Sequence, residues 1–268
     1  MAAHSSGENQ VFADERQARI AELVATRGRV RIAELTQLFG VTEPTLRKDL
    51  SALQDRGLLK RTYGGALAML PVVDREFAGR EEANRAGKEA IARACLDLLR
   101  DGDSVFLDSG TTVDALARSL AARNGQGGGP RLSVLTNTLH VAQALADVPG
   151  IDCVLLGGQL QRLEGSVIGP LAIDNLGRFA FSVAFLGVSG FSESGISVGS
   201  IGEAAVKAAV IDRARRVVVP LEHTKAGTSD FARIAGLDAV DVVVTDEPVA
   251  GVAELCDSHG IELVSAGV

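Results

Sequence analysis

The sequence is poor in cysteine, which limits the kinds of site it can build. Its three cysteines, Cys95, Cys153 and Cys256, are odd in number, lie far apart and form no Cys-x-x-Cys pair. A disulfide framework, a zinc site of paired cysteines and a dithiol redox site all depend on such pairs. The pattern argues against all three and predicts reduced thiols in a cytosolic protein.

Long apolar runs are also missing. Residues 1–10 are polar and contain no apolar signal-peptide core. No run reaches the roughly 18 apolar residues that a membrane span requires. We therefore expect a cytoplasmic protein that is neither secreted nor inserted in a membrane. Aromatic residues are scarce as well, with 9 Phe, 1 Tyr and no Trp, so a core must be built from Val, Leu, Ile and Ala.

The charge is unevenly distributed along the 268 residues, whose length fits two domains. The whole chain has a formal net charge of −7. Its first 70 residues hold 10 basic and 8 acidic residues, a net of +2, so residues 71–268 carry −9. This asymmetry is typical of a nucleic-acid-binding module attached to an acidic domain that does not touch phosphates.

Three short helices are predicted near the start of the chain. Apolar residues recur at helical spacing within residues 14–26 and again within residues 32–39, and the second of these helices ends at Gly40. A third helix begins at Thr42, an N-cap residue, with Pro44 in its first turn. The second and third helices therefore meet across a tight turn.

The third helix has one apolar face and one small, polar and basic face. The apolar face consists of Leu46, Leu50 and Leu53. The opposite face and its flanks present Pro44, Thr45, Arg47, Lys48 and Ser51. Such a face can enter a DNA major groove, where side chains near the helix start meet base edges and basic side chains contact guanine or phosphate. The alternative is a solvated charged helix in another small helical bundle.

A basic hairpin predicted over residues 58–66 favours the DNA-binding alternative, because a hairpin after a recognition helix forms a wing. The segments V-T-E-P-T-L-R-K-D-L (41–50) and L-Q-D-R-G-L-L-K-R-T-Y-G-G-A (53–66) resemble the DNA-binding domain of the DeoR family of transcription regulators. The resemblance covers residues 15–66 and implies a winged helix-turn-helix. The operator contacts that it implies come from Thr42, Thr45, Arg47, Lys48, Arg61 and Tyr63. The family more often has Arg-Arg at Arg47-Lys48 and His at Tyr63, which affects the operator sequence.

We predict a winged helix-turn-helix domain over residues 12–68, a linker over 69–84 and an α/β domain over 85–268. The linker is charged and weakly patterned, and a helix over 88–99 opens the second domain. Short apolar runs then alternate with helical stretches, which predicts a mainly parallel sheet flanked by helices. The predicted strands are Val105–Leu107, Leu132–Leu135, Val154–Leu156, Val183–Leu186, Val217–Val219 and Val240–Val244.

The loop after the first of these strands has the composition of a phosphate site. It reads Asp108-Ser109-Gly110-Thr111-Thr112 and runs into a helix. Its glycine lets the backbone approach a ligand, its hydroxyls can donate, and the helix N-terminus supplies oriented N–H groups. The patterns of nucleotide and dinucleotide loops are absent, so a small phosphorylated ligand is favoured over ATP or NAD. An ordinary capped strand-to-helix turn is equally compatible with this loop alone.

Other polar residues follow the later strands, and each also has a structural explanation as a cap, a turn or a solvated side chain. They are Thr136, Asn137, Gly157, Gly158, the segment 187–190 and the segment 222–225, which ends in Lys225. Glu203 and Lys207, four residues apart on one predicted helix, form a surface ion pair or face the pocket. The four histidines have no ligand spacing, so no metal site is predicted. Among them, His223 either contacts a ligand or lies in a surface loop.

Taken together, these motifs resemble the DeoR-family sensor domain over residues 80–250. The resemblance implies a fold related to ribose-5-phosphate isomerase and a pocket for a phosphorylated sugar. The effector-binding residues that follow are Lys88, Asp108, Ser109, Gly110, Thr111, Thr112, Thr136, Asn137, Gly157, Gly158, Glu203, Lys207 and Lys225. Lys88 matches a phosphate-side lysine, and Glu203 and Lys207 match positions that are catalytic in the enzyme relatives.

The alternative is an isomerase-like enzyme with an accessory DNA-binding domain. The isomerases carry an Asp-Gly-Ala-Asp-Glu stretch where this chain reads Gly187-Val188-Ser189-Gly190, so two carboxylates needed for proton transfer are missing. We therefore predict sugar binding without turnover, with no catalytic residue and no cofactor.

The resemblance implies a repressor of carbohydrate-metabolism genes that is relieved or modulated by its effector. Because one winged helix makes few base contacts, we expect a homodimer or homotetramer, assembled through the C-terminal domain, on double-stranded operator DNA with paired half-sites. The effector would shift the sensor between states that hold the readers differently. A third possibility, a ligand-independent architectural DNA binder, predicts no preference for any ligand.

Overall fold

The computed structural model describes residues 13–68, 79–161 and 164–267. Its contacts divide the chain into two compact units, Met1–Pro71 and Val72–Val268. Residue 12 of the predicted first domain and residues 69–78 of the predicted linker lie outside the described residues. No described helix is long and apolar enough to cross a membrane.

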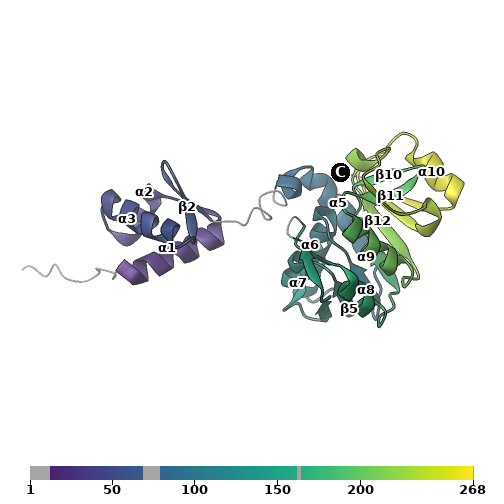
Figure 1. Ribbon diagram of the computed structural model, residues 1–268, viewed down its shortest axis with the longest axis horizontal. Coiled ribbons are helices and arrows are strands. Elements are labelled where there is room, and N and C mark those ends of the chain that lie inside the picture. The colour runs from purple at the N-terminus through teal and green to yellow at the C-terminus, as the bar shows by residue number, and fades with distance from the viewer. Residues whose placement is uncertain (1–12, 69–78, 162–163, 268) are drawn as a thin grey trace, which may run out of the picture. The chain divides into compact units, whose positions relative to one another are not determined.

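The first unit is a winged helix-turn-helix (Figure 1). Its elements are α1 (Ala13–Arg27), β1 (Arg29–Arg31), α2 (Ile32–Phe39), α3 (Glu43–Asp55), β2 (Leu59–Thr62) and β3 (Gly65–Ala68). The strands form an antiparallel sheet in the order β1-β3-β2. The predicted helices and wing are confirmed. Strand β1 was not predicted, because in three residues only Val30 is buried and no alternation can be recognised.

The core of this unit fixes which face of α3 points outward. Leu46, Leu50 and Leu53 are buried against α1 and α2, as the periodicity predicted. Beside them the buried Asp49 carboxylate accepts a hydrogen bond from Arg16 Nε of α1 at 2.6 Å. This buried, charge-assisted contact fixes α3 on α1 and leaves the opposite face of α3 free.

The second unit is built on a seven-stranded, fully parallel sheet in the order β15-β14-β12-β9-β4-β5-β6. The strands are β4 (Ser104–Leu107), β5 (Leu132–Thr136), β6 (Ile151–Leu155), β9 (Val183–Phe185), β12 (Val217–Leu221), β14 (Val242–Thr245) and β15 (Glu262–Ser265). The six predicted strands and the α/β class are confirmed. Strand β15 was missed because it is an edge strand of mixed composition with no buried residue.

Helices cover both faces of this sheet. They are α5 (Arg85–Leu96), α6 (Thr111–Gly125), α7 (Leu139–Leu145), α8 (Pro170–Leu176), α9 (Ile201–Ile211) and α10 (Val252–His259). Val105 and Leu107 of β4 pack in one cluster with α5, α6 and α7, whereas Phe106 packs in another with α8 and α9. The alternation of side chains along a strand therefore builds a three-layer unit.

Short elements complete the second unit. A small antiparallel sheet in the order β10-β11-β13 packs with α10 in a third apolar cluster, and these elements lie together in Figure 1. The remaining elements are β7 (Gln159–Gln161), β8 (Ser166–Ile168), β10 (Gly190–Ser192), β11 (Gly195–Val198), β13 (Ala232–Ala235) and the 3-10 turns η1 (His223–Lys225) and η2 (Leu237–Ala239). Residues 79–82, which were assigned to the linker, are helical.

Candidate functional site

The outward face of α3 is the candidate DNA-reading surface of the first unit. Thr42 and Thr45 share a hydrogen bond of 3.0 Å between their hydroxyl oxygens at the start of the helix. Lys48 is exposed one turn later. Arg47 is also exposed and lies 3.1 Å, measured from Nε, from Oε1 of Glu43 in the preceding turn. The structure thus gathers the four predicted contact residues on one helix surface.

The wing extends this surface. Arg61 of β2 donates its backbone N–H to Gln54 Oε1 at 2.9 Å and its Nη1 to Ser51 Oγ at 3.2 Å, so the wing is fixed against α3. Tyr63, between β2 and β3, is 99% exposed. A fully exposed aromatic side chain at the end of a basic hairpin is available to contact a partner.

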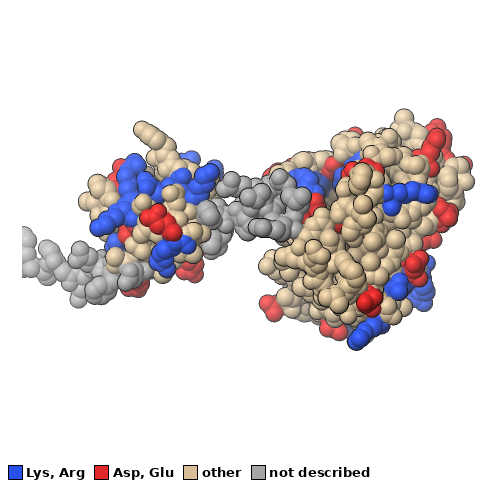
Figure 2. Space-filling model, viewed as in Figure 1, with Lys and Arg blue, Asp and Glu red and all other residues tan. Residues whose placement is uncertain are grey.

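Basic side chains cover much of the visible face of the first unit in Figure 2. The exposed ones are Arg19, Arg27, Arg29, Arg31, Arg47, Lys48, Arg56 and Lys60. Cations in this number supply the sequence-independent attraction to phosphates on which DNA binding depends.

The second unit contains a cavity of about 400 Å³ at the carboxyl ends of β4, β9 and β12. In a parallel α/β sheet this edge is where ligands bind, and the volume suits a small molecule. Eight of the predicted effector residues line it: Lys88, Ser109, Gly110, Thr111, Thr112, Glu203, Lys207 and Lys225.

The loop after β4 forms one wall of this cavity and is the candidate anion-binding segment. Gly110, at φ 125° in a conformation that favours glycine, precedes the first turn of the 15-residue helix α6. A Cβ on Gly187, in the loop after β9, would lie 2.1 Å from the Ser109 carbonyl oxygen, so glycine is required for the two loops to touch. Thr112 is 4% exposed, and its hydroxyl has no hydrogen-bond partner among the described residues. An unpaired buried hydroxyl beside a helix N-terminus suits a ligand oxygen.

Among the described residues, four cations line the cavity, and three of them are already paired. Lys207 forms a buried ion pair with Asp108, whose carboxylate also accepts the Gly187 N–H at 3.0 Å. Lys88 Nζ lies 3.3 Å from Glu222 Oε2, and Arg80 pairs with Glu164. Buried charges are tolerated when they are matched in this way. Asp108 does not line the cavity and instead positions Lys207 and the loop after β9.

Lys225 is the fourth cation and differs from the others. Burial lowers its pKa, an effect that nearby Glu222 opposes. Among the described residues, no carboxylate forms an ion pair with it. A half-buried ammonium without a counter-ion, in a cavity beside a helix N-terminus, favours an anionic ligand.

Glu203 lies in the same cavity, so it is not part of a surface ion pair. Its side chain is 7% exposed and lies 3.5 Å from the Ser166 hydroxyl, while Lys207 turns to Asp108. Burial raises the pKa of Glu203 to about 7, against the lowering effect of Lys207. The surface alternative for this pair was wrong because α9 is buried on the cavity side.

Five predicted effector residues do not line the cavity, namely Asp108, Thr136, Asn137, Gly157 and Gly158. Thr136 ends β5 and Asn137 follows it. Both are buried, and the Asn137 carbonyl accepts the Val167 N–H at 2.6 Å. Gly157 and Gly158 are exposed. A Cβ on Gly158 would lie 2.8 Å from Val167 Cγ1, so this glycine allows close packing of the turn.

The cavity also has walls that were not predicted. Arg80, Gln161, Glu164 and Glu222 line it together with the predicted residues. The Gln161 amide oxygen is buried, and no group in the described part of the chain forms a hydrogen bond with it. Glu222 follows β12, and its position at a strand end was the one signal that could have identified it.

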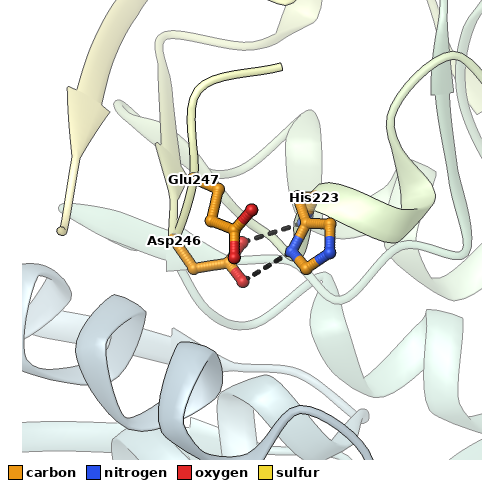
Figure 3. A group of neighbouring side chains, drawn as sticks. All are labelled: His223, Asp246 and Glu247. Atoms are coloured by element: carbon orange, nitrogen blue, oxygen red, sulfur yellow. Dashed lines mark hydrogen bonds and ion pairs between the residues drawn. The ribbon is translucent and has the colours of Figure 1, made fainter. Parts of the chain in front are cut away.

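His223 joins Asp246 and Glu247 in a cluster beside the cavity loops (Figure 3). Asp246 accepts hydrogen bonds from His223 N and Nδ1, both at 2.8 Å, and from Asn84 Nδ2 at 2.7 Å. The hydrogen bond to Asp246 raises the pKa of His223. The three ligand-type side chains lie within 4.8 Å of one another, but the carboxylate that a cation needs is occupied by three donors. We interpret the cluster as a contact that joins two loops to the start of α5.

A DNA-reading winged helix joined to an α/β unit with a polar, cation-lined cavity has the organisation of a ligand-responsive transcription regulator. Two family models match this chain: the DeoR-like helix-turn-helix domain over residues 16–71 and the DeoR C-terminal sensor domain over residues 83–247. The chain belongs to the DeoR family, whose members regulate transcription and are not enzymes.

Two curated relatives extend over almost the whole chain. The HTH-type transcriptional repressor GlcR of Bacillus subtilis (strain 168) is 32% identical, over 95% of this chain and 96% of the relative. The glycerol-3-phosphate regulon repressor of Escherichia coli (strain K12) is 31% identical, over 93% and 97%. Among solved structures, ribose 5-phosphate isomerase A of Methanocaldococcus jannaschii is 18% identical with a TM-score of 0.40, over 53% of this chain and 55% of that chain.

Proposed function

We propose that this chain is a cytoplasmic repressor of carbohydrate-metabolism genes whose hold on operator DNA is weakened by a phosphorylated sugar-like effector. Two relatives that match more than nine-tenths of the chain are named repressors, and one of them acts on a glycerol-3-phosphate regulon. The same division of labour, a DNA reader followed by an effector sensor, fits the two units of this chain.

In the proposed complex, α3 enters the major groove. Thr45, Arg47 and Lys48 face the bases and phosphates from its outward side, and Thr42 contacts the backbone at the helix start. Arg61 and Tyr63 extend the contact from the wing. A repressor of this kind binds as a homodimer or homotetramer assembled through its second unit, since paired readers recognise paired half-sites.

The observation that carries the effector proposal is the unpaired Lys225 in the same cavity as the unpaired Thr112 hydroxyl. A phosphate group supplies the negative charge and the acceptor oxygens that these two groups lack. The cavity volume of about 400 Å³ leaves room for a small polyol or sugar attached to that phosphate.

Thermal unfolding of the full chain against a panel of sugar phosphates, glycerol 3-phosphate and the matching free sugars tests this proposal. We expect at least one phosphorylated compound to stabilise the protein, because a ligand that binds only the folded state raises its free energy of unfolding. Substitution Lys225→Ala should weaken that binding by about tenfold or more, the value of a charge-assisted hydrogen bond. Arg100→Ala, at an exposed arginine away from the cavity, should not.

Equal stabilisation by a sugar and its phosphate would contradict a phosphate site. The repressor proposal is tested separately with a duplex selected from random DNA by the full chain. The phosphorylated compound should weaken binding to that duplex in a gel shift, and strengthened binding would contradict relief of repression.

A further inference from the structure

Residues 79–84, here called the leading segment, form the first described part of the second unit. Residues 69–78, which precede them, connect this unit to the DNA-binding unit. The segment is helical over residues 79–82 and reaches α5 through Asn84, which has φ 49°. Among the described residues, Asn84 is the only non-glycine with a positive φ, so the chain changes direction there.

The leading segment is part of the cavity wall. Arg80 and Ala83 both line the cavity. The backbone carbonyls of these two residues accept hydrogen bonds from Lys88 Nζ, and Lys88 itself lines the cavity and pairs with Glu222. A ligand in the cavity therefore lies against backbone and side chains of the chain segment that leads to the DNA-binding unit.

Arg80 makes the contact that an anionic ligand can replace. Its Nη1 and Nη2 lie 2.9 Å from Oε1 and Oε2 of Glu164, in the forked arrangement that arginine also uses for phosphate. The Arg80 side chain is 48% exposed, and ion pairs with this exposure contribute little to stability. Replacing Glu164 by another anionic partner of Arg80 therefore costs little free energy.

The far end of the segment is fixed. Asn84 Nδ2 donates to Asp246 Oδ2 at 2.7 Å, and a Cβ on Gly87 would lie 2.3 Å from the same oxygen. This close packing holds the start of α5 against the loop after β14. We therefore expect a change at Arg80 to be taken up by residues 79–83, because Asn84 and the start of α5 are held by Asp246.

We propose that Arg80 binds the anionic group of the effector in exchange for Glu164, and that this exchange repositions the leading segment and so links cavity occupancy to the DNA-binding unit. This inference rests on the proposed effector class. It adds Arg80 to the effector-binding residues. It also names the leading segment as the part of the chain that couples the two units.

The test measures the affinity of the full chain for glycerol 3-phosphate, ribose 5-phosphate and inorganic phosphate by calorimetry. Arg80→Ala should weaken binding of the tightest of these probes by about tenfold, the value of a charge-assisted contact at a partly exposed site. The matched control is Arg85→Ala, because Arg85 is exposed, forms an ion pair with Glu82 and does not line the cavity.

Glu164→Gln gives the opposite expectation, because it removes the group that competes with the ligand for Arg80. Binding of the same probe should become tighter, and most of this gain should be absent in the Arg80→Ala background. A double-mutant cycle isolates this coupled part from general repulsion between Glu164 and the ligand.

Two measurements test whether ligand binding in the cavity is coupled to the leading segment and to DNA binding. The tightest probe should change hydrogen exchange of the amides of residues 79–83 in the wild type and in Arg85→Ala but not in Arg80→Ala. The ratio of operator affinities with and without the probe should approach one in Arg80→Ala.

The outcomes separate the two proposals. A wild-type chain that binds none of the probes contradicts the effector class and this inference with it. A wild-type chain that binds a probe, with Arg80→Ala binding it equally and responding to it equally on DNA, contradicts only the role of Arg80. Lower thermal stability of Arg80→Ala with unchanged binding and response also overturns it, since the arginine would then serve the fold alone.

Discussion

At the scale of single residues, the cavity concentrates charge where water is scarce. Lys207 and Asp108 are 2% and 0% exposed in their side chains, and Glu203 is 7% exposed. Isolated charges are costly at such sites, so a buried charge needs a partner of opposite sign. The first two residues stabilise each other, whereas Glu203 has only a long contact with a hydroxyl.

Removing one charge of the buried pair should lower the free energy of unfolding more than removing both charges. Lys207→Met leaves the Asp108 carboxylate without its counter-ion, and we expect a loss of about 3 kcal/mol in the free energy of unfolding. The double variant Asp108→Asn with Lys207→Met should recover part of that loss. Urea unfolding of the two variants and the wild type makes the comparison, and a single variant as stable as the double would show that the pair is not coupled.

Glu203 should make stability depend on pH in a predictable direction. Its folded pKa of about 7 lies above the ordinary value of 4.5, so the folded protein holds a proton that the unfolded chain has released. The free energy of unfolding therefore falls as pH rises from 4.5 to about 7 and levels off above that range. Glu203→Gln removes this contribution.

Stability of Glu203→Gln relative to the wild type should rise across that interval by on the order of 3 kcal/mol. Denaturant unfolding at a series of pH values gives the measurement. Glu193→Gln, at an exposed glutamate between β10 and β11, is the control and should leave the pH profile unchanged. A profile for Glu203→Gln parallel to that of the wild type would exclude a raised pKa at this residue.

At the scale of elements, the hairpin β7–β8 and its connecting loop add a polar wall to the cavity. Gln161 of β7 and Glu164 of the loop line it, and Ser166 of β8 contacts Glu203. The unpaired amide oxygen of Gln161 needs a donor. A hydroxyl or amino group of the ligand is the simplest source.

Gln161→Leu should therefore distinguish the sugar part of a ligand from its phosphate. We expect binding of a phosphorylated polyol or sugar to weaken by about fivefold to tenfold, the value of a neutral hydrogen bond. Binding of inorganic phosphate should stay unchanged, as should binding of both compounds by Gln159→Leu, which lies on the same strand outside the cavity lining. Equal weakening for phosphate and sugar phosphate would show a general distortion.

Elements of the parallel sheet could be predicted because buried strands are continuous apolar runs between helical stretches, as in Val217–Leu221. The candidate anion-binding loop was predicted from its position after such a strand, and its residues 109–112 do line the cavity. Anion binding by this loop stays a prediction. The short antiparallel strands have three or four residues, too few for a period to be recognised. Arg80 was assigned to a linker, because what places it at the cavity is tertiary contact with Glu164 and Lys88. Gln161 was assigned to no element, because its place depends on the pairing of the three-residue strand β7 with β8.

At the scale of the whole molecule, the DNA-binding part of the chain has a net positive charge and the remainder has a net negative charge. The first 70 residues have a net charge of +2 and residues 71–268 have −9. The exposed cations of the first unit attract DNA, whereas the acidic second unit is repelled by it. Binding through the first unit alone is therefore favoured electrostatically.

Affinity for the selected operator should fall steeply as salt concentration rises. Each phosphate contact contributes about −0.9 to the slope of log affinity against log salt. Lys48→Ala should weaken binding and reduce this slope by about one for each reader in the complex. Arg100→Ala, an exposed substitution in the second unit, should change neither. An unchanged slope in Lys48→Ala would remove this lysine from the phosphate contacts.

Tyr63 is the only tyrosine of the chain, which has no tryptophan. Because its ring is 99% exposed on the wing, all tyrosine emission of the protein comes from one place on the proposed DNA-binding surface. Quenching of that emission on addition of a duplex would report contact at the wing without any label. The unmodified protein therefore contains its own optical probe for the moment at which the wing meets DNA.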